Sequence, residues 1–259
     1  MSVVLVTGGT GELGALVVER LLAGGDEVRV LSRRAAPAAT DSASLQHVVG
    51  DLSTGAGLDD ATDGVDAVVH CASDGRRPRA VDVEGTRRLV QAIARNGRPH
   101  LVHVSIVGVD RIPLGYYQAK LAAERLVEGS GLPFSIQRST QFPSLIRGLL
   151  AAQSRLPVVL CLRGFRFQPV DPAEVADRLV QHVRTGPAGR APDMGGPHVV
   201  ALEDLARTWL AATGRRRAVL RVPVPGKVSQ AFRAGANLCP DQAVGVRTWE
   251  QALPVRSAG

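Results

Sequence analysis

The amino-acid sequence predicts an α/β protein with a parallel β-sheet, because short runs rich in β-branched residues alternate with helical patterns along its first half. The composition is compatible with that fold. The chain has 259 residues, of which 45% are hydrophobic and 21% charged, and this is enough apolar material for one large core with a small appended lobe. We therefore expect one domain with a C-terminal extension.

The elements of the first half follow from the period of the apolar residues and from glycines at helix ends. The predicted strands are Val3–Thr7, Glu27–Leu31, Leu45–Val49, Ala67–His70, Leu101–Ser105 and Phe134–Arg138. The predicted helices are Gly11–Ala23, Val81–Asn96 before Gly97, and Tyr116–Glu128 before Gly129. Right-handed crossovers favour a doubly wound order for these six strands.

After Arg138 the alternation becomes less regular. The predicted helices there are Ser144–Ser154, Asp171–Arg184 and Leu202–Thr213, and the predicted strands are Val158–Leu162, Phe165–Val170 and Ala218–Val222.

The composition also argues against several classes of protein. No run of about eighteen apolar residues is present and the N-terminus has the pattern of a strand, so we expect a cytoplasmic protein without a membrane segment. Cys71, Cys161 and Cys239 show no C-x-x-C spacing, so we expect reduced thiols and no metal site. The net charge of +7 permits nucleic-acid binding, but aromatic residues make up only 3%, so we expect no nucleic-acid partner.

The first strand, turn and helix start carry a glycine motif with the spacing G-x-x-G-x-x-G. Gly8 allows a tight turn, Gly11 lets the backbone approach a pyrophosphate, and Gly14 lets the helix pack against the sheet. The alternative is a glycine turn that only connects a strand to a helix. We favour dinucleotide binding by a Rossmann-type doubly wound sheet. The other predicted cofactor contacts of this loop are Thr10, Glu12 and Leu13.

The residues after the second strand, Ser32, Arg33 and Arg34, predict which dinucleotide is bound. A cofactor without a 2′-phosphate is met at this place by an Asp or Glu that hydrogen-bonds its ribose, and that acidic residue is missing. A guanidinium here can hold the phosphate in a bidentate contact. The alternative is two surface arginines in an arginine-rich chain. We expect NADP(H) rather than NAD(H).

Several motifs together resemble the short-chain dehydrogenases/reductases, and within them the atypical NmrA-like NAD(P)-binding branch. The resemblance covers about residues 3–142 and rests on Thr7–Gly14, Gly50–Leu52, His70–Ser73, Val81–Thr86, Val102–Ser105, Tyr116–Glu124 and Gly131–Phe134. Asp82 stands where the family usually has Asn. The resemblance implies cofactor contacts by Asp51, Leu52, Cys71, Ala72, Ser73 and Lys120. It also implies the candidate catalytic residues Ser105, Tyr116 and Lys120.

Tyr116 and Lys120 lie four residues apart and therefore on one helix face, which brings the phenol near the ammonium. A nearby cation lowers the pKa of a phenol from its ordinary value of about 10, so Tyr116 is expected to give a proton to a carbonyl oxygen that Ser105 steadies. Lys120 is one of only two lysines in this arginine-rich chain, which indicates a specific need for lysine. The alternatives are an ordinary helix start with an exposed lysine, or Tyr117 as the working phenol.

Arg138–Phe142 follows the sixth strand at the carboxyl edge of the sheet, where open α/β sheets bind their ligands. Arg138 and Thr140 are therefore expected beside the nicotinamide. A set of apolar side chains either lines a pocket or, as such spacing more commonly indicates, forms core: Phe142, Leu145, Ile146, Leu149, Phe165 and Phe167. His182 and His198 are expected at the surface or in loops.

These interpretations divide the chain into an NAD(P)-binding Rossmann domain, residues 1–142, and a substrate-covering lobe integrated with it, residues 143–259. The expected function is NADPH-dependent reduction of a small apolar carbonyl, quinone or imine-like substrate by hydride transfer, with Tyr116 as proton donor. One alternative is a non-catalytic NADP(H)-binding sensor or regulatory protein of the NmrA-like type. A further alternative is a nucleotide-dependent epimerase.

Overall fold

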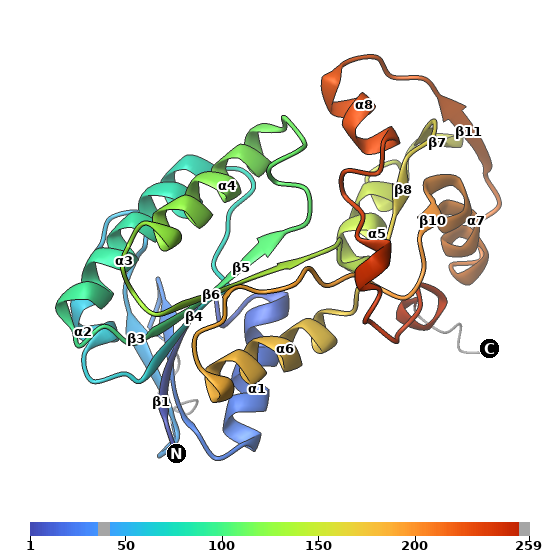
Figure 1. Ribbon diagram of the computed structural model, residues 1–259. Coiled ribbons are helices and arrows are strands. Elements are labelled where there is room, and N and C mark those ends of the chain that lie inside the picture. Colours follow the sequence, from blue (N-terminus) through green and yellow to red (C-terminus); the bar gives the residue numbers. More distant parts are fainter. Residues whose placement is uncertain (36–41, 254–259) are drawn as a thin grey trace. The chain divides into compact units, whose positions relative to one another are not determined.

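The computed structural model describes residues 1–35 and 42–253, and its central element is a sheet with the strand order β3-β2-β1-β4-β5-β6-β9 (Figure 1). The strands are β1 (Val3–Thr7), β2 (Glu27–Ser32), β3 (Leu45–Val49), β4 (Ala67–His70), β5 (His100–Ile106), β6 (Phe134–Ser139) and β9 (Gly189–Arg190). The first six follow the order typical of a doubly wound sheet, so the predicted fold class is confirmed. The sheet has seven strands rather than six because the short β9 pairs in parallel with β6. Two residues are too few to show a period in the sequence.

Helices cover both faces of this sheet (Figure 1). On one face lie α1 (Glu12–Ala23) and α6 (Pro172–Thr185), and on the other lie α2 (Leu58–Thr62), α3 (Thr86–Arg95) and α4 (Gly115–Glu128). The helix expected at Val81–Asn96 begins earlier, at Arg79, and its first turns are π-helical (η2, Arg79–Gly85) before α3 continues them. This wider coil places Asp82 with its side chain in the interior.

Strand residues alternate between the two faces of the sheet, as the apolar pattern predicts. Leu5, Val68, Leu101 and Ile136 are buried on the face that α2, α3 and α4 cover. The buried residues that complete this core are Leu31, Leu52, Leu58, Ala61, Val65, Leu89, Ala92, Ile93, Val127 and Leu132. The carboxyl ends of the strands are thereby held in one row, and the loops that follow them are placed side by side.

The described chain forms two compact units, which do not correspond to one cut in the sequence. The first unit comprises Met1–Ser105, Gly115–Arg138 and Pro172–Pro192, and the second comprises the rest. The boundary expected from the sequence lay between residues 142 and 143, and six residues of the expected lobe, 254–259, lie outside the described part. Helix α6 and strand β9 belong to the first unit because the buried face of α6, with Val175 and Leu179, packs beside α1 on the sheet.

The second unit contains short sheets and helices of its own. Its strands are β7 (Val158–Leu162), parallel to β11 (Ala218–Val222), and β8 (Arg166–Phe167), antiparallel to β10 (Val200–Ala201). Its helices are α5 (Pro143–Ala151), α7 (Leu202–Ala212) and α8 (Lys227–Arg233), with the 3₁₀ turns η3 (Pro240–Gln242) and η4 (Glu250–Ala252).

Five of the six apolar residues that the sequence left open between pocket and core fall into two groups, and the sixth, Phe142, is half-buried. Ile146, Phe165 and Phe167 are buried, and the Phe165 ring stacks on Phe232 at 4.9 Å between ring centroids. These three are core. Leu145 and Leu149 are exposed on α5.

In the described ranges no helix is both long and apolar enough to cross a bilayer, and no group of His, Cys, Asp and Glu side chains has the geometry of a metal site.

The expectation that His182 lies at the surface is wrong. Its ring is buried in α6 and its Nε2 lies 3.0 Å from the Gln137 Oε1 on β6, because α6 packs on the sheet instead of standing in solvent.

Replacing Gly14 by alanine is expected to destabilise the protein and disrupt the glycine loop. A Cβ at this position would lie 2.2 Å from the carbonyl oxygen of Gly8 and 2.7 Å from its carbonyl carbon, so the backbone of the loop must move. We expect the free energy of unfolding to fall by about 1–3 kcal/mol, measured by urea denaturation. The matched control is Gly148→Ala in α5, where a Cβ has nothing within 4 Å, and the higher helix propensity of alanine should raise stability by about 0.5–1 kcal/mol. Equal effects in the two variants would contradict the packing argument.

Candidate functional site

The loop between β1 and α1 is built by the close approach of two backbones. Gly8 has φ +70°, and a Cβ on it would lie 2.7 Å from the backbone nitrogen of Ala72 in the loop after β4. The N–H of Gly11 donates to the Gly8 carbonyl at 2.9 Å, and no side chain caps the helix start at Gly11. The first N–H groups of α1 therefore remain available to an anionic group, as the motif predicts.

A cleft of about 890 Å³ lies in the first unit at the carboxyl ends of β1 to β4. The lining residues that the sequence predicted are Gly8, Thr10, Gly11, Ser32, Arg33, Arg34, Asp51, Leu52, Cys71, Ala72 and Ser73. The lining residues that it missed are Leu31, Gly50, Asp74, Arg77 and Val81. The predicted contacts that do not line the cleft are Glu12, Leu13, Gly14, Lys120, Arg138 and Thr140. Thr140 belongs to the second unit, where its hydroxyl donates to the Gln168 carbonyl.

One end of this cleft is strongly basic. Arg33, Arg34 and Arg77 line it together with the carboxylate of Asp51. Hydrogen bonds from the Ser53 hydroxyl and backbone N–H, both 2.7 Å from the Asp51 Oδ1, hold the pKa of Asp51 below its usual value against the opposing effect of burial, and the charges of Arg33 and Arg77 lower it further. Arg77 lies in the short basic run Arg76–Arg79, a pattern that is more typical of a solvated turn than of a binding site. Its position shortly after β4 was the signal that could have identified it.

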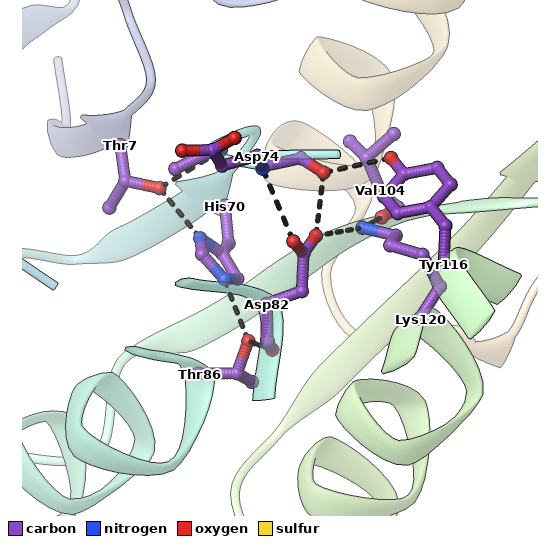
Figure 2. Close-up of polar contacts among 10 residues, drawn as sticks. Thr7, His70, Asp74, Asp82, Thr86, Val104, Tyr116 and Lys120 are labelled. Atoms are coloured by element: carbon purple, nitrogen blue, oxygen red, sulfur yellow. Dashed lines mark hydrogen bonds and ion pairs between the residues drawn. The ribbon is translucent and has the colours of Figure 1, made fainter. Parts of the chain in front are cut away.

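Four side chains of the first unit are connected beside the cleft by two hydrogen bonds and one ion pair (Figure 2). The Tyr116 hydroxyl lies 2.8 Å from the Ser73 Oγ, and that hydroxyl donates to the Asp82 Oδ1 at 2.6 Å. The Lys120 ammonium donates to the Val104 carbonyl at 2.7 Å and lies 3.7 Å from the same Asp82 oxygen. Ser73 thus links the Tyr116 phenol to the cleft, and Asp82 links Ser73 to Lys120.

The two neighbouring tyrosines have different surroundings. Tyr116 is half-buried and its hydroxyl reaches Ser73, which lines the cleft. Tyr117 is 6% exposed and packs on the inner side of α4, with its ring edge toward that of Tyr116 at 6.3 Å between centroids. Of the two tyrosines, Tyr116 is therefore the one whose hydroxyl is shown to contact a residue that lines the cleft.

The electrostatics of Tyr116 differ from the expectation. Burial raises the pKa of its phenol above the usual value, and the Asp82 carboxylate raises it further. A donor hydrogen bond from Ser73 would oppose this increase, but the single hydrogen of that hydroxyl is directed at Asp82. The expectation that Lys120 lowers the pKa of the Tyr116 phenol is wrong for this arrangement. The ammonium is hydrogen-bonded to Val104 and paired with Asp82 instead.

Lys120 itself is almost completely buried, with 5% of its side chain exposed. Burial lowers the pKa of its ammonium, and the nearby carboxylates of Asp82 and Glu124 oppose that change. The alternative of an exposed lysine at an ordinary helix start is therefore wrong.

Ser105 and Arg138, expected near the reacting groups, both face the buried Glu124 carboxylate in the first unit. The Arg138 guanidinium forms a bidentate pair with the buried Glu124 carboxylate at 2.8 and 2.7 Å, and Arg190 on β9 joins the pair at 3.0 Å. The buried Ser105 hydroxyl faces Glu124 without a well-aligned hydrogen bond to any described residue. A buried carboxylate on α4 draws charged neighbours toward it, and the spacing of residues in the sequence does not reveal this.

A second hydrogen-bonded chain connects the end of β1 with Asp82 through a buried histidine (Figure 2). The Thr7 hydroxyl lies 2.6 Å from the His70 Nδ1, the His70 Nε2 lies 3.0 Å from the Thr86 hydroxyl, and that hydroxyl donates to the Asp82 carbonyl at 2.6 Å. Burial and, to a smaller extent, the charge of Lys120 lower the pKa of His70 to about 3. His70 is thus held neutral between two hydroxyl groups.

This buried histidine makes stability depend on pH. The pKa of His70 is lower in the folded state, about 3, than its ordinary value of 6.5. Its contribution to stability is therefore complete above pH 6.5 and is lost as the pH falls toward 3. One such group contributes a slope of about 1.4 kcal/mol per pH unit inside that window. The variant His70→Gln is expected to lose this slope, measured as the free energy of unfolding in urea at a series of pH values. His198→Gln is the control; an unchanged slope in His70→Gln would contradict the assignment.

Comparisons with known proteins agree with this geometry. The family model described as NAD(P)H-binding matches residues 8–144. The chain is 41% identical over 112 residues to sterol demethylase protein B of Methylococcus capsulatus, a match that covers 40% of this chain and 34% of that protein. It is 31% identical over 156 residues to a 3-beta-hydroxysteroid dehydrogenase of Mycolicibacterium neoaurum, covering 49% of this chain and 42% of that protein. The matches span less than half the length of these two relatives.

Solved structures extend the similarity to nearly the whole chain. An NADPH-dependent quinone oxidoreductase of Escherichia coli, complexed with NADPH, has a TM-score of 0.82 at 17% identity and covers 96% of this chain and 98% of its own. The Bordetella bronchiseptica enzyme WbmH, in complex with NAD⁺, has a TM-score of 0.69 at 21% identity, with 86% of each chain covered. At these identities the similarity is one of fold.

Proposed function

The chain belongs to the NAD(P)H-binding family, and from this membership we propose that it is an oxidoreductase that uses NADPH to reduce a small apolar carbonyl, quinone or imine-like compound. One observation carries the proposal. The Tyr116 hydroxyl is hydrogen-bonded to Ser73, which lines the cleft, so a weakly acidic O–H group stands at its edge. The solved structure of a quinone oxidoreductase with the same fold supports the substrate class, and the two relatives named for sterol and steroid chemistry add a steroid ketone to the candidates.

The residues of the cleft fit a phosphorylated dinucleotide. The uncapped start of α1 suits a pyrophosphate, because its free N–H groups point outward beside the Gly8 turn. Arg33 and Arg77 at the basic end suit a 2′-phosphate, because a guanidinium can bind two phosphate oxygens at once. When bound, the cofactor supplies a hydride to the substrate.

Arg33→Ala and Arg77→Ala are each expected to weaken the binding of NADP⁺ at least about tenfold more than that of NAD⁺, since a charge-assisted hydrogen bond contributes about 1.5–3 kcal/mol. Calorimetric titration with both cofactors measures the difference. Arg76→Ala is the matched control, because this neighbouring arginine is exposed and does not line the cleft. Equal losses for the two cofactors in Arg33→Ala and Arg77→Ala would refute the phosphate assignment.

In the proposed reaction, Tyr116 gives its proton to the substrate oxygen while the adjacent carbon receives the hydride. A raised phenol pKa suits this direction, because the donor must be protonated at neutral pH before the reaction begins. Lys120 and Asp82 together keep the surroundings of the phenol nearly neutral in charge.

Tyr116→Phe is expected to reduce turnover by about 10²- to 10⁴-fold, the usual contribution of a positioned proton donor, while NADPH binding changes little. The loss of NADPH absorbance with a panel of quinones, ketones and a steroid ketone measures the activity. Tyr117→Phe is the control for the neighbouring phenol and should retain turnover. A panel without any turnover, or full activity in Tyr116→Phe, would refute the proposal.

A second candidate is an NADP(H)-binding sensor that transfers no hydride. One observation favours it: the Lys120 ammonium is bonded to Val104 and Asp82 and does not activate the phenol. Tight NADPH binding with no turnover on the panel would support this candidate over the reductase.

A further inference from the structure

Asp82 takes no direct part in the proton transfer proposed above, although its carboxylate is completely buried, is paired with Lys120 and is linked to Tyr116 through Ser73. One of its oxygens accepts from the Ser73 hydroxyl at 2.6 Å and lies 3.7 Å from the Lys120 ammonium. The other oxygen accepts from the backbone N–H of Asp74 at 3.2 Å. Both oxygens are thus used, and the π-helical turn of η2 orients them toward the cleft loop (Figure 2).

The directions of these hydrogen bonds follow from counting hydrogens. A carboxylate only accepts, so the single hydrogen of the Ser73 hydroxyl goes to Asp82. Ser73 then has only lone pairs to offer the Tyr116 oxygen 2.8 Å away, and the phenol must be the donor in that contact. The phenol can make this bond only in its protonated form.

The other charged and titratable groups near this chain come from the neighbouring elements of the first unit. Those that interact with Lys120 are Asp82 on η2, Glu124 on α4, Cys71 after β4, His70 on β4 and His103 on β5. Of these groups, Asp82 is the one that also influences Tyr116.

We propose that Asp82 is a positioning residue for Tyr116: through the Ser73 hydroxyl, its carboxylate holds the phenol protonated and fixes its oxygen at the edge of the cleft. The proposal names a function for Ser73 in addition to lining the cleft, and it places the hydroxyl partner of the phenol on the loop after β4 instead of at Ser105. It rests on the proposed function only where turnover is concerned.

The test is a spectroscopic titration of the phenol. The chain has only two tyrosines, so subtracting the phenolate absorbance of Tyr116→Phe from that of the parent protein isolates Tyr116. In Asp82→Asn, which removes the charge but keeps the size of the side chain, we expect the midpoint of Tyr116 to fall by about one pH unit. If the phenol of the parent stays protonated until alkaline unfolding, followed by circular dichroism, the variant must titrate below that pH.

Glu84→Gln is the matched control, because it removes the same charge from the same segment, where Glu84 faces Arg87 at the surface. It should leave the midpoint unchanged. An unchanged or higher midpoint in Asp82→Asn would overturn the proposal.

The variant Ser73→Ala tests whether Asp82 acts through the hydroxyl, and it leaves the Asp82 and Lys120 pair in place. In a Ser73→Ala background, Asp82→Asn should shift the midpoint by less than half as much as in the parent. The same shift in both backgrounds would mean that charge alone acts through space, and the proposal would be wrong. This double-mutant cycle remains valid if one variant is less stable, because each titration midpoint is measured only over the pH range in which that variant is folded.

Turnover separates this inference from the proposed function. With an active parent, Asp82→Asn should move the alkaline limb of the pH profile of kcat to lower pH by the same amount as the titration. A titration shift in a protein without any turnover would support the role of Asp82 and refute the reductase. Turnover without a titration shift would support the reductase and refute the role of Asp82.

Discussion

The buried ammonium of Lys120 is the interaction on which the rest of the site depends. Removing such a charge from water costs several kcal/mol unless nearby groups compensate it, and only 5% of this side chain reaches solvent. The Val104 carbonyl on β5 and the Asp82 carboxylate on η2 supply that compensation. One charge on α4 therefore requires two other elements to stay close, and it fixes the segment from which the phenol projects.

The same compensation determines the chemistry of Tyr116. An isolated ammonium one turn along the helix would favour the phenolate, but a carboxylate beside the ammonium cancels most of its field. The phenol is left with burial and the Asp82 charge, and both raise its pKa.

The fold and much of the cleft could be predicted from the sequence because both depend on local rules. Alternating strands, glycine spacing and the carboxyl edge of a parallel sheet placed Gly8 and Arg33 together, and the family resemblance added Asp51. The partners of buried charges could not be predicted in this way. Arg138 binds Glu124 and Lys120 binds Asp82, because a charge in the interior takes whichever opposite charge the tertiary structure brings within reach. The spacing of four residues correctly placed Tyr116 and Lys120 on one helix face. The effect of Lys120 on the phenol pKa, however, depends on a third residue, Asp82 of η2.

The protonation state of Tyr116 also bears on whether the proposed reaction runs as a reduction or as an oxidation. An alcohol oxidation needs a base that is ionised before the reaction, and a carbonyl reduction needs an acid that is protonated. The Tyr116 phenol donates to Ser73, whose own hydrogen is held by Asp82, so each link in the chain favours the protonated phenol. A lysine free of Asp82 would favour the opposite state. The arrangement therefore suits a proton donor better than a base, and this agrees with reduction as the direction of the proposed reaction.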